Sequence, residues 1–563
     1  MNSETPKHNE VTSVTRRNMV RYASLFSIAG AMNAFGQVAG PVAAAGATSA
    51  VPAAPVLTPW VQPCPITQEM VPAGVGVPPG FDASNHIAAA KYPAKRWYDL
   101  PLQAVDLKLH PQLKTSSTFF SYGGSVPGKL WRFKYGEPVV VRLTNQIDPA
   151  IGGFGTSSFS PHFHNMHTPS YSDGYPGNTI PPAANPGDPF PYRDHHYPMI
   201  LAGGDSREAL GSLWYHDHQL DYTAQNVYRG MMGMAQVFDA IDSGNENDTN
   251  PAALRLPSGK YDISLLFHDP RIDPNTHEYI MDVFNMDGHL GNTYAVNGAI
   301  QPYMKVERRK YRFRLHVPGP TRIYTLALYN PKTKATIPWT QLSFDGNLLT
   351  APRSAANLEI SPAQRCDVVI DFSKYPTGTQ LYVVNQMVHT DPRSPSGLTT
   401  AATAPQLLRF DVGGLPATPD NSRVPATLRA LPPLPSAATL AALPRRTFKF
   451  DRTNGSWTVN GSVADLSVVS AAPIMGRPEI WRLEGGGNWW HPVHIHFEEG
   501  RILKVNDATP SAKYAGRRDM YLLEPGMTME VLIQWRDFKG QYVMHCHNSV
   551  HEDHSMMVRF DVS

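Results

Sequence analysis

The sequence predicts an all-β protein built from sandwich-like domains. Its 563 residues include 52 prolines and 43 glycines, which separate many short runs of strand-forming residues. Frequent turns between short strands are typical of β-sandwiches, whereas helical domains need longer uninterrupted segments. A chain of this length is sufficient for two to four domains. The clearest predicted strands cover residues 139–143, 261–267, 311–315, 367–372 and 529–533.

A weak internal repeat predicts three similar domains. The pair Arg-Leu ends a predicted strand at nearly equal intervals, and the pair Phe-Asp closes each unit. Two series in the same order indicate a repeated unit more strongly than either series alone. The first series is Arg142-Leu143, Arg314-Leu315 and Arg482-Leu483, and the second is Phe238-Asp239, Phe410-Asp411 and Phe560-Asp561. We predict domains at residues 60–245, 246–415 and 446–563, with an interdomain linker at 416–445 that contains a short helix at 437–443.

The charge balance argues against nucleic acid as a partner. The formal net charge is +2, only 17% of the residues are charged, and no long basic run is present. No segment approaches the ~18 consecutive apolar residues that suggest a membrane-spanning helix. The sequence leaves the oligomeric state open, with a monomer as one option.

The first 45 residues are similar to a bacterial twin-arginine export signal. Arg16 and Arg17 precede a moderately apolar stretch at 23–35, and small residues at 42–45 offer a cleavage site. Met19 departs from the usual pattern, in which a Phe is common at that position. We therefore expect a protein exported to the periplasm or the extracellular space. The alternative is an N-terminus without a targeting role.

The stretch at residues 542–547 carries the strongest chemical signal. Strand-like residues lead into His545-Cys546-His547, so the two histidines should share one face and Cys546 should lie on the other. His551 and Met556 follow five and ten residues after the cysteine. One cysteine thiolate, two histidines and a weak axial methionine form the ligand set of a blue-copper electron-transfer site. His545 and His547 must then serve a second centre behind the first.

Three further histidine clusters supply the remaining ligands. In the last of them His491 has the opposite strand parity to His494 and His496, so His491 belongs with Cys546, His551 and Met556. Eight imidazoles are left for the second centre, which is too many for one ion but suits three. Zinc is a poor match, because a structural zinc site needs four ligands in closed tetrahedral form. The eight come equally from the first and third predicted domains: His162, His164, His216, His218, His494, His496, His545 and His547.

The two remaining cysteines have no assigned role. With Cys546 bound to metal, Cys64 and Cys366 could form one disulfide in an oxidising compartment. The alternative is a pair of separate buried thiols. The sequence cannot show whether the two residues are close in space.

The four histidine motifs together resemble the four signatures of the three-domain multicopper oxidases. The stretches from His162 to Gly174 and from His551 to Met556 are most similar to bacterial laccases of the spore-coat laccase and bilirubin oxidase-like group. The resemblance spans about residues 60–563 and implies three cupredoxin-like Greek-key β-sandwich domains and four copper ions. Asn165 departs from the family, which usually has Gly there. The implied ligands are His491, Cys546, His551 and Met556 for type 1 copper, His162 and His494 for type 2, and His164, His216, His218, His496, His545 and His547 for the type 3 pair.

The resemblance also implies an activity. Such a protein couples one-electron oxidation of phenolic or aromatic amine substrates to four-electron reduction of dioxygen to water. Cys546 would carry electrons to its neighbouring histidines, and Glu552 and Asp173 match acidic residues with proton-donating or supporting roles in the family. A solvated acid or a helix cap is the alternative for each carboxylate. The physiological reductant stays open.

Three alternatives to a laccase remain at the level of the sequence. One is a metal oxidase that acts on manganous or cuprous ion, although the chain has no long Met-rich insertion of the kind expected in a dedicated cuprous oxidase. Another is a copper-binding protein without turnover. The third is a relative of the copper-free cupredoxin proteins of cell division, which is disfavoured because no ligand position is missing.

Overall fold

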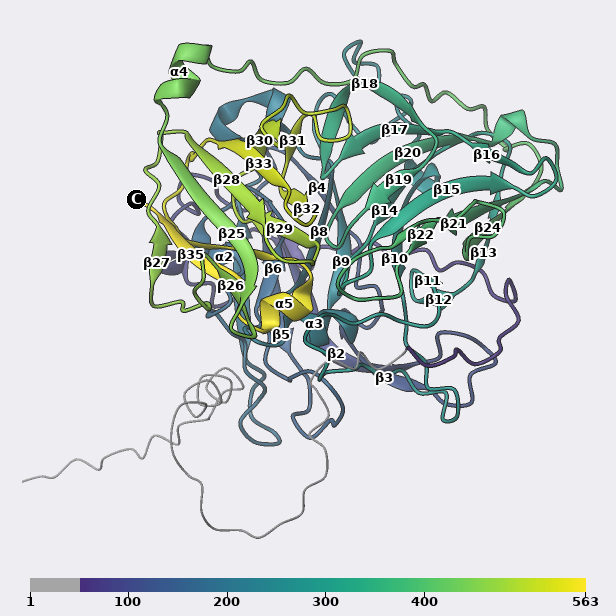
Figure 1. Cartoon of the computed structure of the whole chain (residues 1–563), viewed down its shortest axis with the longest axis horizontal. Coiled ribbons are helices and arrows are strands. Elements are labelled where there is room, and N and C mark those ends of the chain that lie inside the picture. The colour runs from purple at the N-terminus through teal and green to yellow at the C-terminus, as the bar shows by residue number, and fades with distance from the viewer. Residues whose placement is uncertain (1–50) are drawn as a thin grey trace, which may run out of the picture. The chain divides into compact units, whose positions relative to one another are not determined.

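The structure is a computed structural model that describes residues 51–563, so the export segment expected at 1–45 lies outside the described residues. The described chain is mostly β-strand, as Figure 1 shows, and the all-β fold predicted from the sequence is confirmed. The α-helices are short: α2 Ser170–Asp173, α3 Thr223–Tyr228, α4 Ala437–Ala442 and α5 Ser549–Asp553. Single 3-10 turns cover Ala83–Asn85, Ala202–Gly204, Ser206–Glu208, Gly259–Tyr261 and Phe372–Lys374.

The strands fall into three consecutive segments, and every named sheet takes its strands from one segment only. The first segment holds β1 Gly74–Val75, β2 Arg96–Leu107, β3 Ser117–Tyr122, β4 Trp131–Lys134, β5 Val139–Asn145, β6 Pro161–Phe163, β7 Tyr192–Tyr197, β8 Ser212–Asp217 and β9 Met232–Phe238. The third holds β25 Arg445–Thr453, β26 Ser456–Val459, β27 Val469–Ala471, β28 Glu479–Gly485, β29 His491–Ile495, β30 Gly500–Val505, β31 Arg517–Arg518, β32 Met520–Leu523, β33 Thr528–Ile533, β34 Gly540–Cys546 and β35 Met557–Val562.

The middle segment contains two large sheets and a small hairpin. Its strands are β10 Asp262–His268, β11 Ala295–Val296, β12 Ala299–Ile300, β13 Tyr303–Val306, β14 Lys310–His316, β15 Tyr324–Asn330, β16 Ala335–Ile337, β17 Trp339–Phe344, β18 Asn347–Ala355, β19 Leu358–Ile360, β20 Arg365–Asp371, β21 Gln380–Asn385, β22 Met387–Val388, β23 Gly397–Leu398 and β24 Gln406–Val412. The helix predicted in the following linker is present as α4.

The three segments repeat one strand arrangement. A parallel pair near the start of each segment joins β2 to β5, β10 to β14 and β25 to β28. A second parallel pair brings in the closing strand, joining β4 to β9, β13 to β24 and β27 to β35. The Arg-Leu repeats of the sequence lie in β5, β14 and β28, and the Phe residues of the Phe-Asp repeats lie in β9, β24 and β35. The sequence repeat therefore marks equivalent strands.

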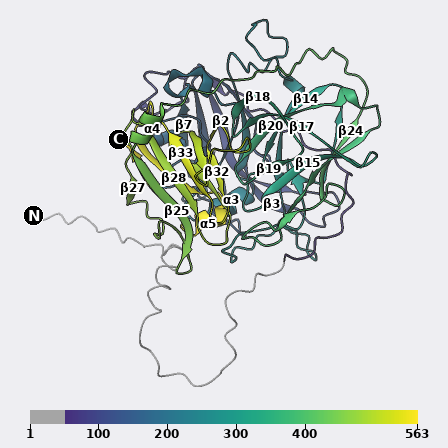
Figure 2. The same cartoon turned by 45° about the horizontal axis from the view of Figure 1, so that its top comes forward.

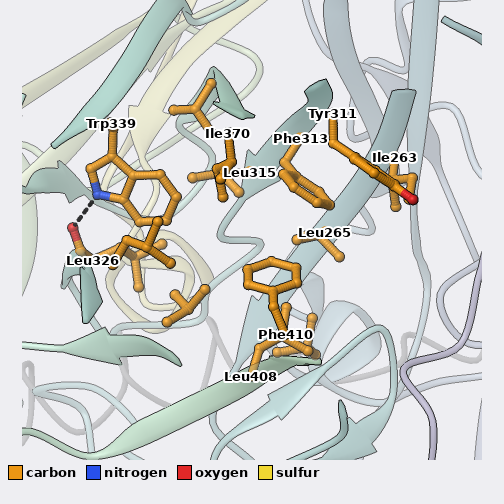
Figure 3. Packing of buried hydrophobic residues seen from close by; sticks show 14 of the residues in the cluster. Ile263, Leu265, Tyr311, Phe313, Leu315, Leu326, Trp339, Ile370, Leu408 and Phe410 are labelled. Carbon is orange, nitrogen blue, oxygen red and sulfur yellow. Dashed lines mark hydrogen bonds between the residues drawn. The ribbon is translucent and has the colours of Figure 1, made fainter. Parts of the chain in front are cut away.

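The core of the middle segment packs side chains from both of its large sheets, as Figure 3 shows. Phe313 and Phe410 lie with ring centroids 5.1 Å apart, and the Trp339 indole donates a hydrogen bond to the Leu326 carbonyl at 3.2 Å. Cys64 and Cys366 are buried in this core as separate free thiols, so the alternative of two unpaired cysteines is confirmed. Burial raises the pKa of both thiols, which makes them unreactive.

No helix within residues 51–563 is both long and apolar enough to cross a membrane.

Candidate metal centre

Strand pairing places the histidine motifs opposite one another. In the first segment His162 of β6 pairs with His216 of β8, and in the third segment His494 of β29 pairs with His545 of β34. His491 starts β29, and Cys546 ends β34. Because side chains alternate along a strand, these registers send His491 and Cys546 to the face opposite His494 and His545.

The smaller cluster gathers one thiol and two imidazoles. The Cys546 Sγ lies 3.7 Å from the Nδ1 of His491 and 3.7 Å from the Nδ1 of His551, and all three side chains are fully buried. Met556 is buried in the same core, where its carbonyl accepts a hydrogen bond from the Cys546 backbone N–H. Trp457 stacks on the His551 ring at 3.7 Å between centroids. The structure thus brings together three of the four residues expected at the type 1 site and places the fourth beside them.

The larger cluster contains all eight remaining histidines. Within the described residues, their ligand nitrogens form three groups whose atoms lie within 4.8 Å of one another. Each group combines histidines from the first and third segments, and no group includes a residue of the middle segment. The groups are His162, His164 and His494, then His164, His216 and His547, then His218, His496 and His545. The cluster therefore lies where the first and third segments meet.

Burial keeps seven of these eight imidazoles neutral at physiological pH. Loss of hydration lowers the pKa of His216 and of His218 to about 3. The same cause lowers the pKa well below the usual value for His162, His164, His494, His496 and His547. A neutral imidazole keeps one nitrogen lone pair free, which is the form that binds a metal.

The arrangement of the ring nitrogens fits metal ions. The Nδ1 of His496 lies 2.7 Å from a carboxylate oxygen of Asp173, which leaves its Nε2 as the lone-pair nitrogen. The Nε2 atoms of His218, His496 and His545 then converge at 3.1 to 3.2 Å from one another. Lone pairs that face one another repel unless a cation lies between them. The Nε2 atoms of His162, His164, His216 and His494 are likewise buried without a hydrogen-bond partner.

The thiol of the smaller cluster leads to the same conclusion. Burial raises the pKa of Cys546, so the thiol stays protonated in the absence of a cation. Within residues 51–563, the ring nitrogens in reach of this thiol are the Nδ1 atoms of His491 and His551. A soft, thiolate-binding metal with imidazole ligands matches this donor set.

Both carboxylates predicted from the sequence lie against the larger cluster. Asp173 is fully buried, and its backbone carbonyl accepts a hydrogen bond from the Nδ1 of His162 while its carboxylate faces His496. Glu552 is also buried, with its two oxygens 3.3 Å from the Nδ1 of His218 and 3.0 Å from the Nδ1 of His545. Each of these two acidic residues thus supports two histidines that lie far apart in the sequence.

Helices α3 and α5, which lie side by side in Figures 1 and 2, deliver Glu552 to this position. The Thr223 hydroxyl at the start of α3 donates to Glu552 at 2.6 Å. Burial opposes ionisation of Glu552, yet His545, His218 and this hydroxyl together hold its pKa below the usual value. The residue is therefore an ionised acceptor at neutral pH.

Two residues of the site were missed by the sequence analysis. The Asp519 carboxylate lies 2.7 Å from the Nδ1 of His164, and the Asp519 carbonyl accepts a hydrogen bond from the Nδ1 of His494 at 2.9 Å. Arg365 of the middle segment holds that carboxylate, with its guanidinium nitrogens at 2.9 and 3.0 Å. Neither residue neighbours a histidine in the sequence, and their contact depends on how the domains pack, so no local signal could have identified them.

The backbone conformation of Gly174 leaves no room for a side chain at this site. Its φ is +95°, and a Cβ at this position would lie 2.4 Å from the Cα of His162 and from the Pro161 carbonyl. We expect Gly174→Ala to destabilise the protein by roughly 2 kcal/mol or more, from backbone strain plus a contact with backbone that cannot move aside. Thermal unfolding of the purified variant tests this. Gly187→Ala is the control, since Gly187 has a similar φ of +92° but open space around it, and an equal loss of stability in both variants would contradict the steric argument.

Known proteins are similar to this chain in sequence and in fold. Two sequence-family models, both described as multicopper oxidase, match this chain at residues 104–241 and 432–563. A bilirubin oxidase of Albifimbria verrucaria is 31% identical over 484 residues, which cover 83% of this chain and 76% of that protein. A laccase of Bacillus subtilis is 27% identical over 83% of this chain and 94% of its own length. The crystal structure of a laccase from Pediococcus acidilactici has the same fold, with a TM-score of 0.71 at 20% identity over 91% of this chain and 95% of that chain.

The fold and the clusters define a cupredoxin-type copper oxidoreductase. The chain belongs to the multicopper oxidase family. It is a bacterial laccase-like member that binds copper, takes electrons from a reductant and uses dioxygen as the acceptor. The metal-oxidase and non-catalytic alternatives considered for the sequence are not favoured by these similarities.

Proposed function

We propose that this protein oxidises phenols and aromatic amines one electron at a time and reduces dioxygen to two waters. The observation that carries the proposal is the position of Cys546, which belongs to the smaller cluster while its chain neighbours His545 and His547 belong to the larger one. One strand end thus connects a one-electron entry site to a site with enough ligands for several ions. The names of the laccase and bilirubin oxidase relatives support aromatic reductants.

We assign four copper ions to the two clusters. His491, Cys546, His551 and Met556 would hold type 1 copper, and His162 and His494 would hold type 2 copper. The bound copper ions supply the redox chemistry, by accepting single electrons and delivering four to dioxygen. The assignment to the type 3 pair is His164, His216, His218, His496, His545 and His547.

The protein's own groups position the imidazoles and exclude water. Asp173, Asp519 and Glu552 each accept or face the Nδ1 of two ligand histidines, which fixes the tautomer and directs the Nε2 inward. All eight histidines are 0 to 1% exposed, so bulk water does not reach the ring nitrogens. We propose that Glu552 and Asp173 also pass on the protons that the reduction of dioxygen consumes.

A variant of Glu552 tests its part in this scheme. Glu552→Gln keeps an acceptor for the Thr223 hydroxyl but removes the charge that faces His218 and His545. We expect turnover per bound copper to fall about a hundredfold, the lower end of what general acid–base groups contribute. Oxygen uptake, normalised to measured copper, is the readout. Asp553→Asn is the control, because this neighbouring carboxylate accepts from the Ala224 N–H instead of facing a histidine. Unchanged turnover in Glu552→Gln would remove the residue from the mechanism.

We also propose the domain limits and the cellular route. The domains are 60–245, 246–415 and 446–563, with the linker at 416–445, since named sheets do not mix strands from these segments. The twin arginine at Arg16-Arg17 supports export by the twin-arginine route to the periplasm or beyond. We propose a monomer, because one chain supplies the donors of both clusters.

The function is tested by copper analysis together with oxygen uptake on a phenolic dye. The copper-loaded protein should contain about four copper ions per chain and consume one dioxygen for every four electrons taken from the dye. Fewer than about four copper ions per chain, together with no oxygen consumption, would indicate a protein that carries copper without turnover. A panel of phenols, manganous ion and cuprous ion then ranks the reductants, and a metal ion oxidised faster than every phenol would overturn the aromatic assignment.

A further inference from the structure

A second site lies between the middle and third segments, and no histidine lines it. It is a cavity of about 350 Å³, within the range of small-molecule sites. The middle segment contributes Phe344, Arg353 and Glu359 to its wall, and the third contributes Lys513 and Arg518. None of these residues takes part in the proposed reaction.

The cavity wall carries excess positive charge. Lys513 and Glu359 neutralise each other in an ion pair of 2.6 Å. Arg353 and Arg518 both lack a carboxylate within ion-pair distance among residues 51–563. Arg353 donates instead to neutral acceptors, the Gln341 side chain and the Ala512 carbonyl at 2.6 Å. Two guanidinium groups with no counter-ion within reach therefore line one small cavity.

Arg518 is the unusual member, because it is only 5% exposed. One of its terminal nitrogens donates to the Lys513 carbonyl, and its guanidinium lies 3.9 Å from the Phe344 ring centroid. Its Nε is buried without any hydrogen-bond partner. A buried, charged donor that is left unpaired costs free energy, which an anion at this position would recover.

The acidic residue Asp345 does not neutralise the buried guanidinium of Arg518. Asp345 is buried and attracts Arg518, but from beyond ion-pair distance, and its backbone-facing oxygen accepts from the Arg365 N–H. Burial raises the pKa of Asp345 to about 7, so its counter-charge is incomplete at neutral pH. Burial lowers the pKa of Arg518; the attraction of Asp345 opposes this shift, and the repulsion from Arg353 adds to it.

The rest of the wall is apolar. Leu358, Ile502, Met520, Leu522 and Met529 line the cavity together with the Phe344 and Tyr521 rings. A ligand that satisfied both surfaces would have one anionic end and an apolar body. We propose that this cavity binds a small organic carboxylate, with its carboxylate between Arg353 and Arg518 and its apolar part against the Met and Leu side chains. Such a ligand would join the middle segment to the third, since each supplies one guanidinium.

Titration calorimetry on the copper-loaded protein tests the proposal, with benzoate as the probe. Benzoate should bind at one site per chain, and benzamide, which has the same shape without the charge, should bind at least about tenfold more weakly. Arg353→Gln should weaken benzoate binding about tenfold or more, because a charge-assisted hydrogen bond is lost. No benzoate binding, or equal affinity for benzamide, would overturn the proposal.

Two further variants separate this site from the copper ions, which also attract carboxylates. Arg445→Gln removes the same charge outside the cavity, from an arginine paired with Glu530, and should leave benzoate affinity unchanged. Lys513→Gln changes a half-exposed residue of the cavity wall and should also weaken benzoate binding. This variant tests the site if Arg353→Gln does not fold. If benzoate affinity is unchanged in both Arg353→Gln and Lys513→Gln, benzoate binds elsewhere and the assignment is wrong.

Discussion

Replacing Cys546 with Ser is expected to abolish both the blue colour and the oxidase activity of the copper-loaded protein. A serine hydroxyl is a poor ligand for copper at neutral pH, and the thiolate–copper bond is the source of the blue absorption. Loss of a residue that only supports a metal ligand costs about 10- to 100-fold, so loss of the ligand itself should leave less than about a hundredth of the activity. The visible spectrum and oxygen uptake measure the two effects.

The control for this variant is Cys366→Ser in the middle segment. Cys366 is as completely buried as Cys546, so it carries the same cost of placing a hydroxyl in a core. It contacts Gln341 and no histidine, and the colour and activity should survive. Retained oxidation in Cys546→Ser, with copper still bound, would show that electrons reach the larger cluster by another path.

The second large effect is expected from Arg365→Gln, far from any histidine motif in the sequence. Arg365 is fully buried and holds Asp519, which in turn contacts His164 and His494. Removing the guanidinium leaves a buried carboxylate beside Asp345 and Glu499, which compete with it for the remaining positive charge. Breaking a buried pair of this kind costs about 3 to 5 kcal/mol of stability.

Copper content should fall as well, since His164 and His494 lose the support that orients them. We expect copper affinity at the cluster to drop about 10- to 100-fold, which copper analysis after dialysis and the type 2 electron paramagnetic resonance signal can follow. Arg309→Gln is the matched control. Arg309 is equally buried between Glu246 and Asp420 but touches none of the clusters, so it should lose stability and keep its copper. Full copper occupancy in Arg365→Gln would mean that Asp519 holds the histidines unaided.

Local pattern was sufficient to predict the strands that carry the histidines. The alternation of His545, Cys546 and His547 on one strand predicted two centres back to back, and the register of β29 with β34 places His494 opposite His545 as that pattern requires. The repeats at Arg314 and Phe410 likewise predicted strands of a domain that contributes no cluster residue. A pattern that repeats every two residues predicts strand faces reliably, because the alternation of side chains follows from backbone geometry.

What the sequence did not predict depends on contacts between segments. The support of His164 by Asp519 and Arg365 joins residues that lie hundreds of positions apart, and each looks like an ordinary strand residue in its own context. The pair of unpaired guanidiniums at Arg353 and Arg518 became visible only once two domains were packed together. Packing of this kind is set by shape and charge across an interface, which a single sequence does not display.

The positions of the cluster residues along the chain also set an order of events during synthesis. Each group of ligand atoms includes at least one residue from position 491 onward, and the thiol-containing group lies wholly within 491–551. A ribosome that has finished the first two domains has therefore produced a chain in which every cluster found among residues 51–563 still lacks at least one ligand. Copper can be loaded only after the last strands have been made and have paired with one another. Until then the nascent protein offers a metal ion none of these clusters in complete form.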